Sequence, residues 1–219
     1  MPKLKWDEDG KREYETGVSK GVLFVMTNGA YGAGVAWNGL TTVTESPSGA
    51  ESSKQYADNI PYLNIISAEE FAGTIEAFTW PDEFDECDGV AEVALGVTIG
   101  QQSRKSFGFA YRTEIGNDTN GLRHGYKIKL IYGATAKPSE KAYATVNESP
   151  EATKFSWEVS TVPTAVEGFM PTSTVTIDST TVDPVKMQAL EALIYGSASA
   201  TSKLPTPAEV IALVGAVVP

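Results

Sequence analysis

Alternation of apolar and polar side chains is the feature of this sequence that most constrains its fold. In GYKIKLIYG, residues 125–133, the apolar positions 126, 128, 130 and 132 oppose Lys127 and Lys129. A period of two is typical of a half-buried β-strand, because successive side chains of a strand point to opposite faces. This pattern, in full or in shorter form, predicts strands at residues 22–26, 33–37, 40–44, 74–79, 91–99, 107–111, 126–132, 142–146, 155–161 and 174–177.

Helices are expected late in the chain. Asp183–Pro184 supplies an N-cap and a proline at the first helical position before VKMQALEALIY, and Gly196 can end this helix. Residues 206–209, TPAE, form a capping-box pattern before a second apolar run. A shorter helix is expected at residues 67–72, SAEEFA.

Spacers rich in turn residues separate the predicted strands, which favours a sandwich or barrel of antiparallel strands. We find no internal repeat and no domain boundary in the sequence. The prediction is therefore one mainly β domain over residues 1–219, with two packed antiparallel sheets and a short C-terminal helical appendix.

A hairpin is predicted around Asn38–Gly39, because this pair suits the two positive φ angles of a type I′ turn. After Glu45 the strand pattern gives way to Ser, Pro, Gly, Ala, Glu and Lys until about Tyr62. Loops longer than about 12–15 residues are uncommon inside compact domains and are usually functional or disordered. Residues 45–62 are therefore expected to form a long loop that carries a function.

The composition sets limits on the class of protein. The 219 residues include 17 basic and 28 acidic side chains, for a formal net charge of −11. So negative a surface argues against wrapping nucleic acid or docking on anionic lipid. With one cysteine no disulfide can form within the chain, and the first ten residues, MPKLKWDEDG, lack the apolar core of a secretory signal.

Acidic residues are concentrated in one part of the chain. Ten of them, and no lysine or arginine, lie between residues 55 and 103, and five lie in PDEFDECD, residues 81–88. The cluster could form a divalent-metal site or a carboxylate pair for glycoside hydrolysis, but the spacing matches neither, and a solvated loop or charged wall fits better. The run GNDTNG at 116–121 offers Ca²⁺ ligands but is also typical of a turn. The neighbouring carboxylates are expected to raise the pKa of Cys87, and His124 lacks partners for a triad or a zinc site.

The remaining motifs have structural interpretations as well. GAYGAG at residues 29–34 lacks the following helix that would hold a phosphate, so a flexible connector is expected. Trp37 and Trp157 lie in strand patterns and are predicted to fill the core, which leaves Trp6 and Trp80 as candidates for a sugar-binding platform. The sequence indicates no enzyme.

Three segments of the chain carry a family resemblance. They are residues 37–89 (WNGLTTVTESPSGAESSKQYADNIPYLNIISAEEFAGTIEAFTWPDEFDECDG), 107–163 (FGFAYRTEIGNDTNGLRHGYKIKLIYGATAKPSEKAYATVNESPEATKFSWEVSTVP) and 183–213, from DPVKMQALEALIYG to LPTPAEVIAL. The sequence here resembles the major tail tube protein of phages with long non-contractile tails, in the branch that infects Gram-positive hosts. The order of the segments also agrees, and together they cover most of the chain.

The resemblance implies a structural protein of the virion, made in the host cytoplasm. Members of this family fold as two packed β-sheets with a flanking α-helix and assemble as hexameric rings. Strands of six subunits close into an inner barrel, and stacked rings form the tail tube through which the genome passes. The implied partners are further copies of the chain, the tape-measure protein, the tail-tip initiator and the tail terminator. Phage DNA passes without sequence-specific binding, no membrane is bound, and no catalytic residue, cofactor or metal site is carried over.

The resemblance also implies that the long loop contacts a neighbouring ring. A polar loop cannot order itself in a monomer, because each fixed residue costs about 1–2 kcal/mol of backbone entropy. The N-terminal arm, residues 1–20, and the chain after Gly196 within the C-terminal helical segment 183–215 are expected to form further joints. The expected inter-ring residues are Ser46, Pro47, Ser48, Gly49, Lys54, Gln55, Tyr56, Asp58 and Asn59.

An acidic wall suits a conduit for DNA. Six copies at −11 each would repel a duplex that carries one negative charge per about 1.7 Å. This repulsion acts within a screening length of about 8 Å at physiological salt. The acidic residues expected to face the lumen are Glu76, Asp82, Glu83, Asp85, Glu86 and Glu92.

Two other classes of protein remain open. The first is a secreted carbohydrate-binding β-sandwich, with tryptophans as the platform and the turn at 116–121 as a Ca²⁺ loop. The second is a glycosidase with an acid pair, for which the sequence offers carboxylates but no arrangement. Within the tail tube interpretation, the tube could belong to an infectious phage or to a phage-derived particle.

Overall fold

The computed structural model describes residues 3–146, 148 and 151–215. Strands make up 47% of the chain and helices 13%, which confirms the prediction of a mainly β fold. The helices are the 3₁₀ turn η1 (Asp82–Phe84), α1 (Asp85–Asp88), α2 (Pro184–Tyr195) and α3 (Pro207–Val214). The strands are β1 (Glu13–Thr27), β2 (Ala30–Tyr31), β3 (Val35–Trp37), β4 (Leu40–Glu45), β5 (Ser48–Gly49), β6 (Ser52–Ala57), β7 (Ile60–Ile66), β8 (Glu69–Glu70), β9 (Ala72–Ala77), β10 (Ala91–Ala94), β11 (Val97–Ile99), β12 (Phe107–Asn117), β13 (Gly121–Ala136), β14 (Phe155–Thr161) and β15 (Thr174–Asp178).

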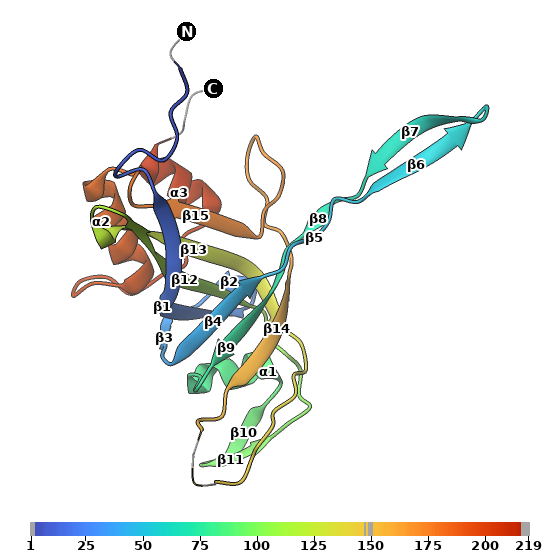
Figure 1. Ribbon diagram of the computed structural model, residues 1–219. Coiled ribbons are helices and arrows are strands. Elements are labelled where there is room, and N and C mark those ends of the chain that lie inside the picture. The colour runs from blue at the N-terminus through green and yellow to red at the C-terminus, as the bar shows by residue number, and fades with distance from the viewer. Residues whose placement is uncertain (1–2, 147, 149–150, 216–219) are drawn as a thin grey trace.

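One antiparallel sheet of nine strands bends back on itself to make two packed layers, as Figure 1 shows. Strand β13 joins the layers. Its residues 127–131 pair with β15, while its last residues, 134–136, pair with β14. The first layer contains β15, β13, β12, β1 and β3, and the second contains β14, β9 and β4. We call these two layers, with the helices packed on them, the body.

Aromatic side chains fill the space between the two layers. The Trp37 ring lies 5.5 Å from the Phe109 ring of the first layer and 5.5 Å from the Trp157 ring of the second. Phe84, from η1, enters the same core and lies 5.3 Å from Trp157. The prediction that Trp37 and Trp157 fill the core is confirmed, since both are buried. Burying one such side chain contributes about 1.5–3 kcal/mol of transfer free energy.

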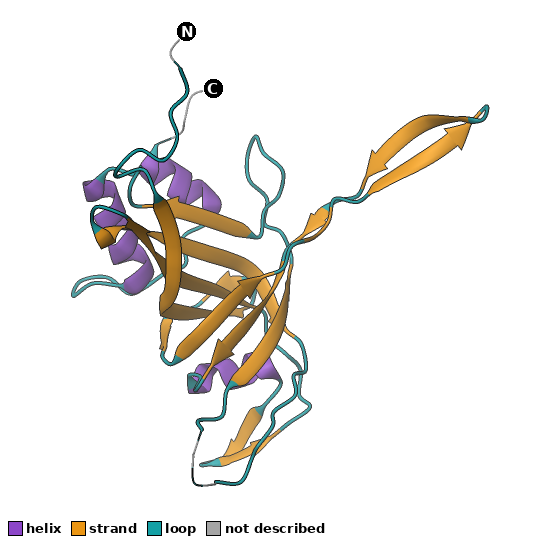
Figure 2. Ribbon diagram, in the orientation of Figure 1, coloured by secondary structure: helices purple, strands orange, loops and turns teal. Residues whose placement is uncertain are grey.

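A second apolar core lies on the opposite face of the first layer. Alternate residues of β13, Ile128 and Leu130 among them, point to this face and contact Met187, Leu190 and Ile194 of α2. In Figure 2 the helices α2 and α3 lie together on this side of the sheet. The molecule therefore has three layers, one of helices and two of strands.

The helix signals in the sequence are confirmed. The Asp183 carboxylate accepts hydrogen bonds from the backbone N–H groups of Val185 (2.9 Å) and Lys186 (3.3 Å). Thr206 and Glu209 form the predicted capping box at the start of α3. These bonds satisfy amide groups that a helix N-terminus leaves without partners.

The prediction of a hairpin at Asn38–Gly39 is wrong. Strand β3 pairs with β1 and β4 pairs with β9, so these residues form a corner between the layers. A type I′ turn needs positive φ at both central residues, and here only Gly39 has it. That turn geometry occurs instead at Asn28–Gly29, with φ of 53° and 80°, between β1 and β2. The interpretation of 29–34 as a mere connector therefore missed a short strand.

Three further local predictions are wrong. The single strand predicted at 91–99 is a hairpin, because Gly96 at φ 74° reverses the chain between β10 and β11. The helix predicted at 67–72 is extended, since β8 within it pairs with β5. The strand predicted at 142–146 does not form. Its residues have no sheet neighbour among the described strands, and Tyr143 is exposed.

Candidate functional site

The segment between β4 and β9 is a projecting β-arm. Residues 46–71, which we call the arm, leave the body as the short ladder β5–β8 and continue as the longer hairpin β6–β7. Figure 1 shows the arm extending well beyond the rest of the molecule. The prediction of a structureless loop at 45–62 is therefore wrong, although the segment does lie apart from the core. All nine expected inter-ring residues lie on the arm: Ser46, Pro47, Ser48, Gly49, Lys54, Gln55, Tyr56, Asp58 and Asn59.

Turn and pairing residues explain why the arm forms strands. Asp58 and Asn59 have φ of 51° and 63° and form the tight turn at the tip, as Asn and Asp tolerate this conformation. Near the root, Gly49 has φ of 89°, and a Cβ there would lie 2.3 Å from the carbonyl oxygen of Ala68. Only glycine fits so close a crossing of the two chains. The arm is thus specified by its sequence even though it has no core.

The second strand of the hairpin carries exposed apolar side chains. Ile60, Tyr62, Leu63, Ile65 and Ile66 are all more than half exposed, from 53% to 66%. No described residue of the body covers them. An isolated two-stranded hairpin is marginally stable in water, and contiguous exposed apolar surface marks interaction sites. The sequence-based expectation placed the contact on polar residues 46–59 and missed this strand, which the run IPYLNII could have revealed.

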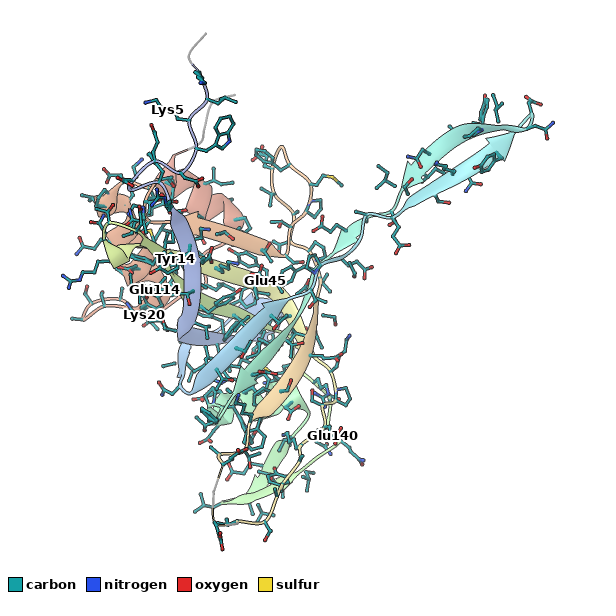
Figure 3. All side chains as sticks on the ribbon, in the orientation of Figure 1. Lys5, Tyr14, Lys20, Glu45, Glu114 and Glu140 are labelled. Carbon is teal, nitrogen blue, oxygen red and sulfur yellow. The ribbon has the colours of Figure 1, made fainter. Side chains whose placement is uncertain are left out.

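A polar cluster holds the root of the arm. The Glu45 carboxylate, at the end of β4, accepts a hydrogen bond from the Tyr111 hydroxyl at 2.6 Å and one from Lys129 Nζ at 3.0 Å. Figure 3 labels Glu45 at the base of the arm. Burial, together with the nearby Glu45 carboxylate, raises the pKa of Tyr111. Glu45 thus joins the arm's root to the first layer.

An ion pair lies next to this cluster. Lys127 Nζ donates to Glu15 at 2.6 Å, and the Thr113 hydroxyl donates to the same carboxylate at 2.6 Å. Partial burial raises the pKa of Glu15, but the hydrogen bonds from Lys127 and Thr113 lower it by more, so the net shift is downward. The hydrogen bond to Glu15 raises the pKa of Lys127.

The outer face of the second layer is polar and no described helix packs on it. Its side chains come from alternate positions of β4, β9 and β14, and the registers place Thr44 beside Thr74 and Thr74 beside Glu158. Helices α2 and α3 pack instead on the first layer (Figure 2). We call this surface the bare face. Its residues are Thr42, Thr44, Thr74, Glu76, Ser156, Glu158 and Ser160.

The structure divides the six acidic residues expected to face a lumen. Glu76 lies on the bare face, opposite Thr42 and Ser156. The other five line a groove of about 760 Å³ at one end of the body, beside α1 and the β10–β11 hairpin. They are Asp82, Glu83, Asp85, Glu86 and Glu92.

Cys87 and Asp88 have structural roles beside the groove. Burial, with a smaller effect of the Glu86 charge, raises the pKa of the Cys87 thiol to about 12, so the sequence-based attribution to carboxylates alone is incomplete. The buried Asp88 carboxylate pairs with Lys141 at 2.7 Å and with Arg104 at 3.2 Å. This pairing ties α1 to two later segments of the chain. A thiol that stays protonated is a poor nucleophile.

The other candidates from the sequence lie apart from one another. The turn at 116–121 is confirmed, with the Asn117 side chain accepting from the backbone N–H groups of Thr119 and Asn120. His124 contacts Asn117 and lies 3.3 Å from Glu13. Within residues 3–146, 148 and 151–215, no group of three His, Cys, Asp or Glu side chains is placed to hold a metal ion.

The tryptophans do not gather into an exposed platform. Trp80 is half-buried, donates to Asp85 at 2.8 Å and packs edge-on against Phe155. Trp6 is 73% exposed and lies on the N-terminal segment before β1, whereas Trp80 follows β9. Trp80 is thus held by its own neighbours, Asp85 and Phe155, rather than presented on an open surface.

Comparison with known proteins places the chain in no family. No protein-family model matches it, and neither does any curated protein. No helix of the described chain has the length and apolar character needed to cross a membrane.

Proposed function

We propose that this chain is a structural subunit that polymerises into a tube, as a tail tube protein of a long-tailed phage or of a phage-derived particle. The observation that carries this proposal is the arm. A two-stranded hairpin with exposed Ile60, Leu63 and Ile65 needs an apolar partner, and no described part of the same chain supplies one. A second copy of the chain is the partner that a self-assembling subunit always has available.

Open strand edges supply the second element of the proposal. The first half of β1, residues 13–19, pairs only with β12 among the described strands, and β15 pairs only with β13. Exposed edges of this kind template pairing with another chain. Strands β15 and β1 run in opposite directions, because three antiparallel pairings separate them. The β15 edge of one copy can therefore pair antiparallel with the β1 edge of the next. Six such steps would close the hexameric ring that the family resemblance implies.

The bare face suits the lumen of the tube. It carries hydroxyl groups and the carboxylates of Glu76 and Glu158, and Lys137 pairs with Glu158 at 3.6 Å. A wall of hydroxyls and weak negative charge offers duplex DNA no cationic sites to bind. We therefore assign the bare face to the lumen, through which tape-measure protein and then phage DNA would pass, with tail-tip initiator and terminator proteins at the two ends.

Negative-stain electron microscopy of the concentrated protein tests this proposal. Stacked rings with an open bore are expected from the native chain. The matched variant replaces residues 48–70 with Asn-Gly, which can join the two strands as a two-residue hairpin because the register that pairs Glu45 with Gly73 continues to Ser48 and Glu70. Phe71, which packs against the core, is kept. The variant is expected to stay folded and to form no tubes. Normal tubes from this variant, or persistent monomers of the native chain under every assembly condition, would contradict the proposal.

A further inference from the structure

The acidic groove has properties of a binding site for a cationic, apolar peptide. Its carboxylates lie around the half-buried apolar side chains of Val25 and Val90. Only Glu86 of the groove carboxylates pairs with a cation of the described chain, namely Lys105. Carboxylates gathered around an apolar floor are complementary to a partner that brings both positive charge and apolar side chains.

Two of the carboxylates are open to such a partner. Asp82 and Glu83 are exposed on η1, and no lysine or arginine of the described chain pairs with them. Asp85 accepts from the Trp80 indole and Glu92 accepts from the backbone of Gly96 at 2.9 Å, so both are hydrogen-bonded but keep their charge uncompensated.

The N-terminal segment has the complementary chemistry. Lys3, Leu4, Lys5 and Trp6 alternate cationic and apolar side chains, and Leu4 and Trp6 are each 73% exposed. The described part of the segment before Asp7 is extended and pairs with no strand, as Figure 3 shows around Lys5. Its only ion pair joins Lys5 to the exposed Glu8 at 3.2 Å.

The segment is anchored at the end of the body far from the groove. The backbone N–H of Gly10 donates to Asp118 at 2.9 Å, and Arg12 lies 3.6 Å from the same carboxylate. Strand β1 then runs from this anchor to the groove, about 40 Å along the chain at 3.3 Å per residue. Residues 3–9 span at most about 25 Å, and in Figure 1 they extend away from α1 and the β10–β11 hairpin, which border the groove. The segment therefore lies at the far end of β1 from the groove of its own chain.

We propose that Lys3–Trp6 of one copy binds in the acidic groove of a second copy. Lys3 and Lys5 would face Asp82 and Glu83, while Leu4 and Trp6 cover the apolar floor. Donor and acceptor lie at opposite ends of the subunit, so this contact is heterologous and propagates as an open stack. The inference rests on the proposed function, because the rings that this contact would join head to tail, in addition to the arm, are part of that proposal.

Cysteine cross-linking between two variants tests this contact directly. The native Cys87 is buried and does not interfere. Trp6→Cys subunits are mixed with Glu83→Cys subunits under a mild oxidant, and an intermolecular disulfide is expected. The matched control pairs Trp6→Cys with Val185→Cys, a 75% exposed position on α2, and is expected to cross-link at least about tenfold less. The yield of this disulfide should also fall as the salt concentration rises, because salt screens the exposed charges that hold the segment in the groove.

Exchanging the charges of the segment and the groove gives a second test that does not depend on cross-linking. Lys3→Glu/Lys5→Glu subunits alone, or Asp82→Lys/Glu83→Lys subunits alone, are each expected to associate end to end about tenfold less. Mixing the two restores association, because every interface in an alternating stack is then complementary. Absence of the disulfide, or no rescue in the mixture, overturns the inference. Electron microscopy of the same samples separates the two proposals, since tubes without the disulfide would leave the proposed function standing.

Discussion

The body and the arm are both antiparallel β-structure, yet they differ in what holds them together. In the body, each strand buries alternate side chains between two layers or under α2, and residues such as Trp157 and Leu130 are wholly buried. In the arm, every residue of β6 and β7 is exposed. Hydrogen-bonded strands therefore do not by themselves indicate a self-sufficient structure, and the arm's apolar surface is available to a partner.

The largest difference is expected when a core residue and an arm residue are truncated. Trp157→Ala removes a buried side chain between the layers and should lower the free energy of unfolding by about 3–5 kcal/mol. Tyr62→Ala, on the arm, should change it by less than about 0.5 kcal/mol. Urea denaturation followed by tryptophan fluorescence and circular dichroism measures both. Equal losses from the two variants would show that the arm is part of the core.

The root of the arm should give an intermediate effect. Glu45→Ala leaves the buried Tyr111 hydroxyl and Lys129 without their acceptor, which should cost about 1–3 kcal/mol of unfolding free energy. Glu158→Ala is the matched control on the same layer. The Glu158 carboxylate is exposed, and its one ion pair within the described chain is a long one of 3.6 Å to the exposed Lys137. The control should change stability by less than about 0.5 kcal/mol. Equal unfolding free energies for the two variants would show that Glu45 does not stabilise the root of the arm.

The Glu15–Lys127 pair should give a small pH dependence. The pKa of Glu15 is lowered in the folded state. Its contribution to the free energy of unfolding is therefore present above the unfolded pKa, near 4.5, and is lost as pH falls through the pKa of the folded state. The pKa of Lys127 is raised, so its contribution is lost only above about pH 10.5. Both groups are about a third exposed, which limits the effect to about 0.2–1 kcal/mol. Glu15→Gln should flatten the stability profile between pH 5 and pH 3 by about that amount, as measured by urea titration at each pH.

Substitutions on the arm should have almost no effect on folding and a large effect on assembly. Ile60→Ser/Leu63→Ser/Ile65→Ser should leave the unfolding free energy within about 0.5 kcal/mol of the native value, since none of these side chains is buried. Sedimentation velocity should show that the variant no longer forms large assemblies. Val185→Ser, which removes an even more exposed apolar side chain from α2, is the control that should assemble normally.

Much of the body could be predicted from the sequence because its strands alternate and its helices carry explicit caps. Strand β14 and helix α2 were expected at their observed positions, and the strands predicted at 107–111 and 126–132 are parts of the longer β12 and β13. The first strand of the arm could not be recognised, because a strand buried on neither face needs no alternation, and polar β6 therefore looks like a loop. The apolar run of β7 was the one signal that the arm carried in the sequence. The hairpin at 91–99 was missed for a related reason, since a turn at Gly96 does not disturb the alternation on either side.

The candidate surfaces were harder to predict than the fold. The acidic residues are evident in the sequence, but their division between Glu76 on the bare face and the groove at the end of the body depends on how the layers bend. The hydroxyl-rich bare face was missed, although Thr42, Thr44 and Thr74 all lie at alternate positions of predicted strands. Which face of a strand stays open is a tertiary property, fixed here by α2 and α3 covering the other layer.

Hydrogen exchange of the arm, in the free subunit and in the assembled protein, tests whether a second copy of the chain is the arm's partner. Amides of β6 and β7 should exchange within the fastest class in the free subunit, because the hairpin has no core. On assembly they should become protected by at least about a hundredfold, while amides of β12 and β13 stay slow throughout. Strong protection of the arm in the free subunit, or an arm that exchanges equally fast in the assembly, would contradict the claim that a second copy is the arm's partner.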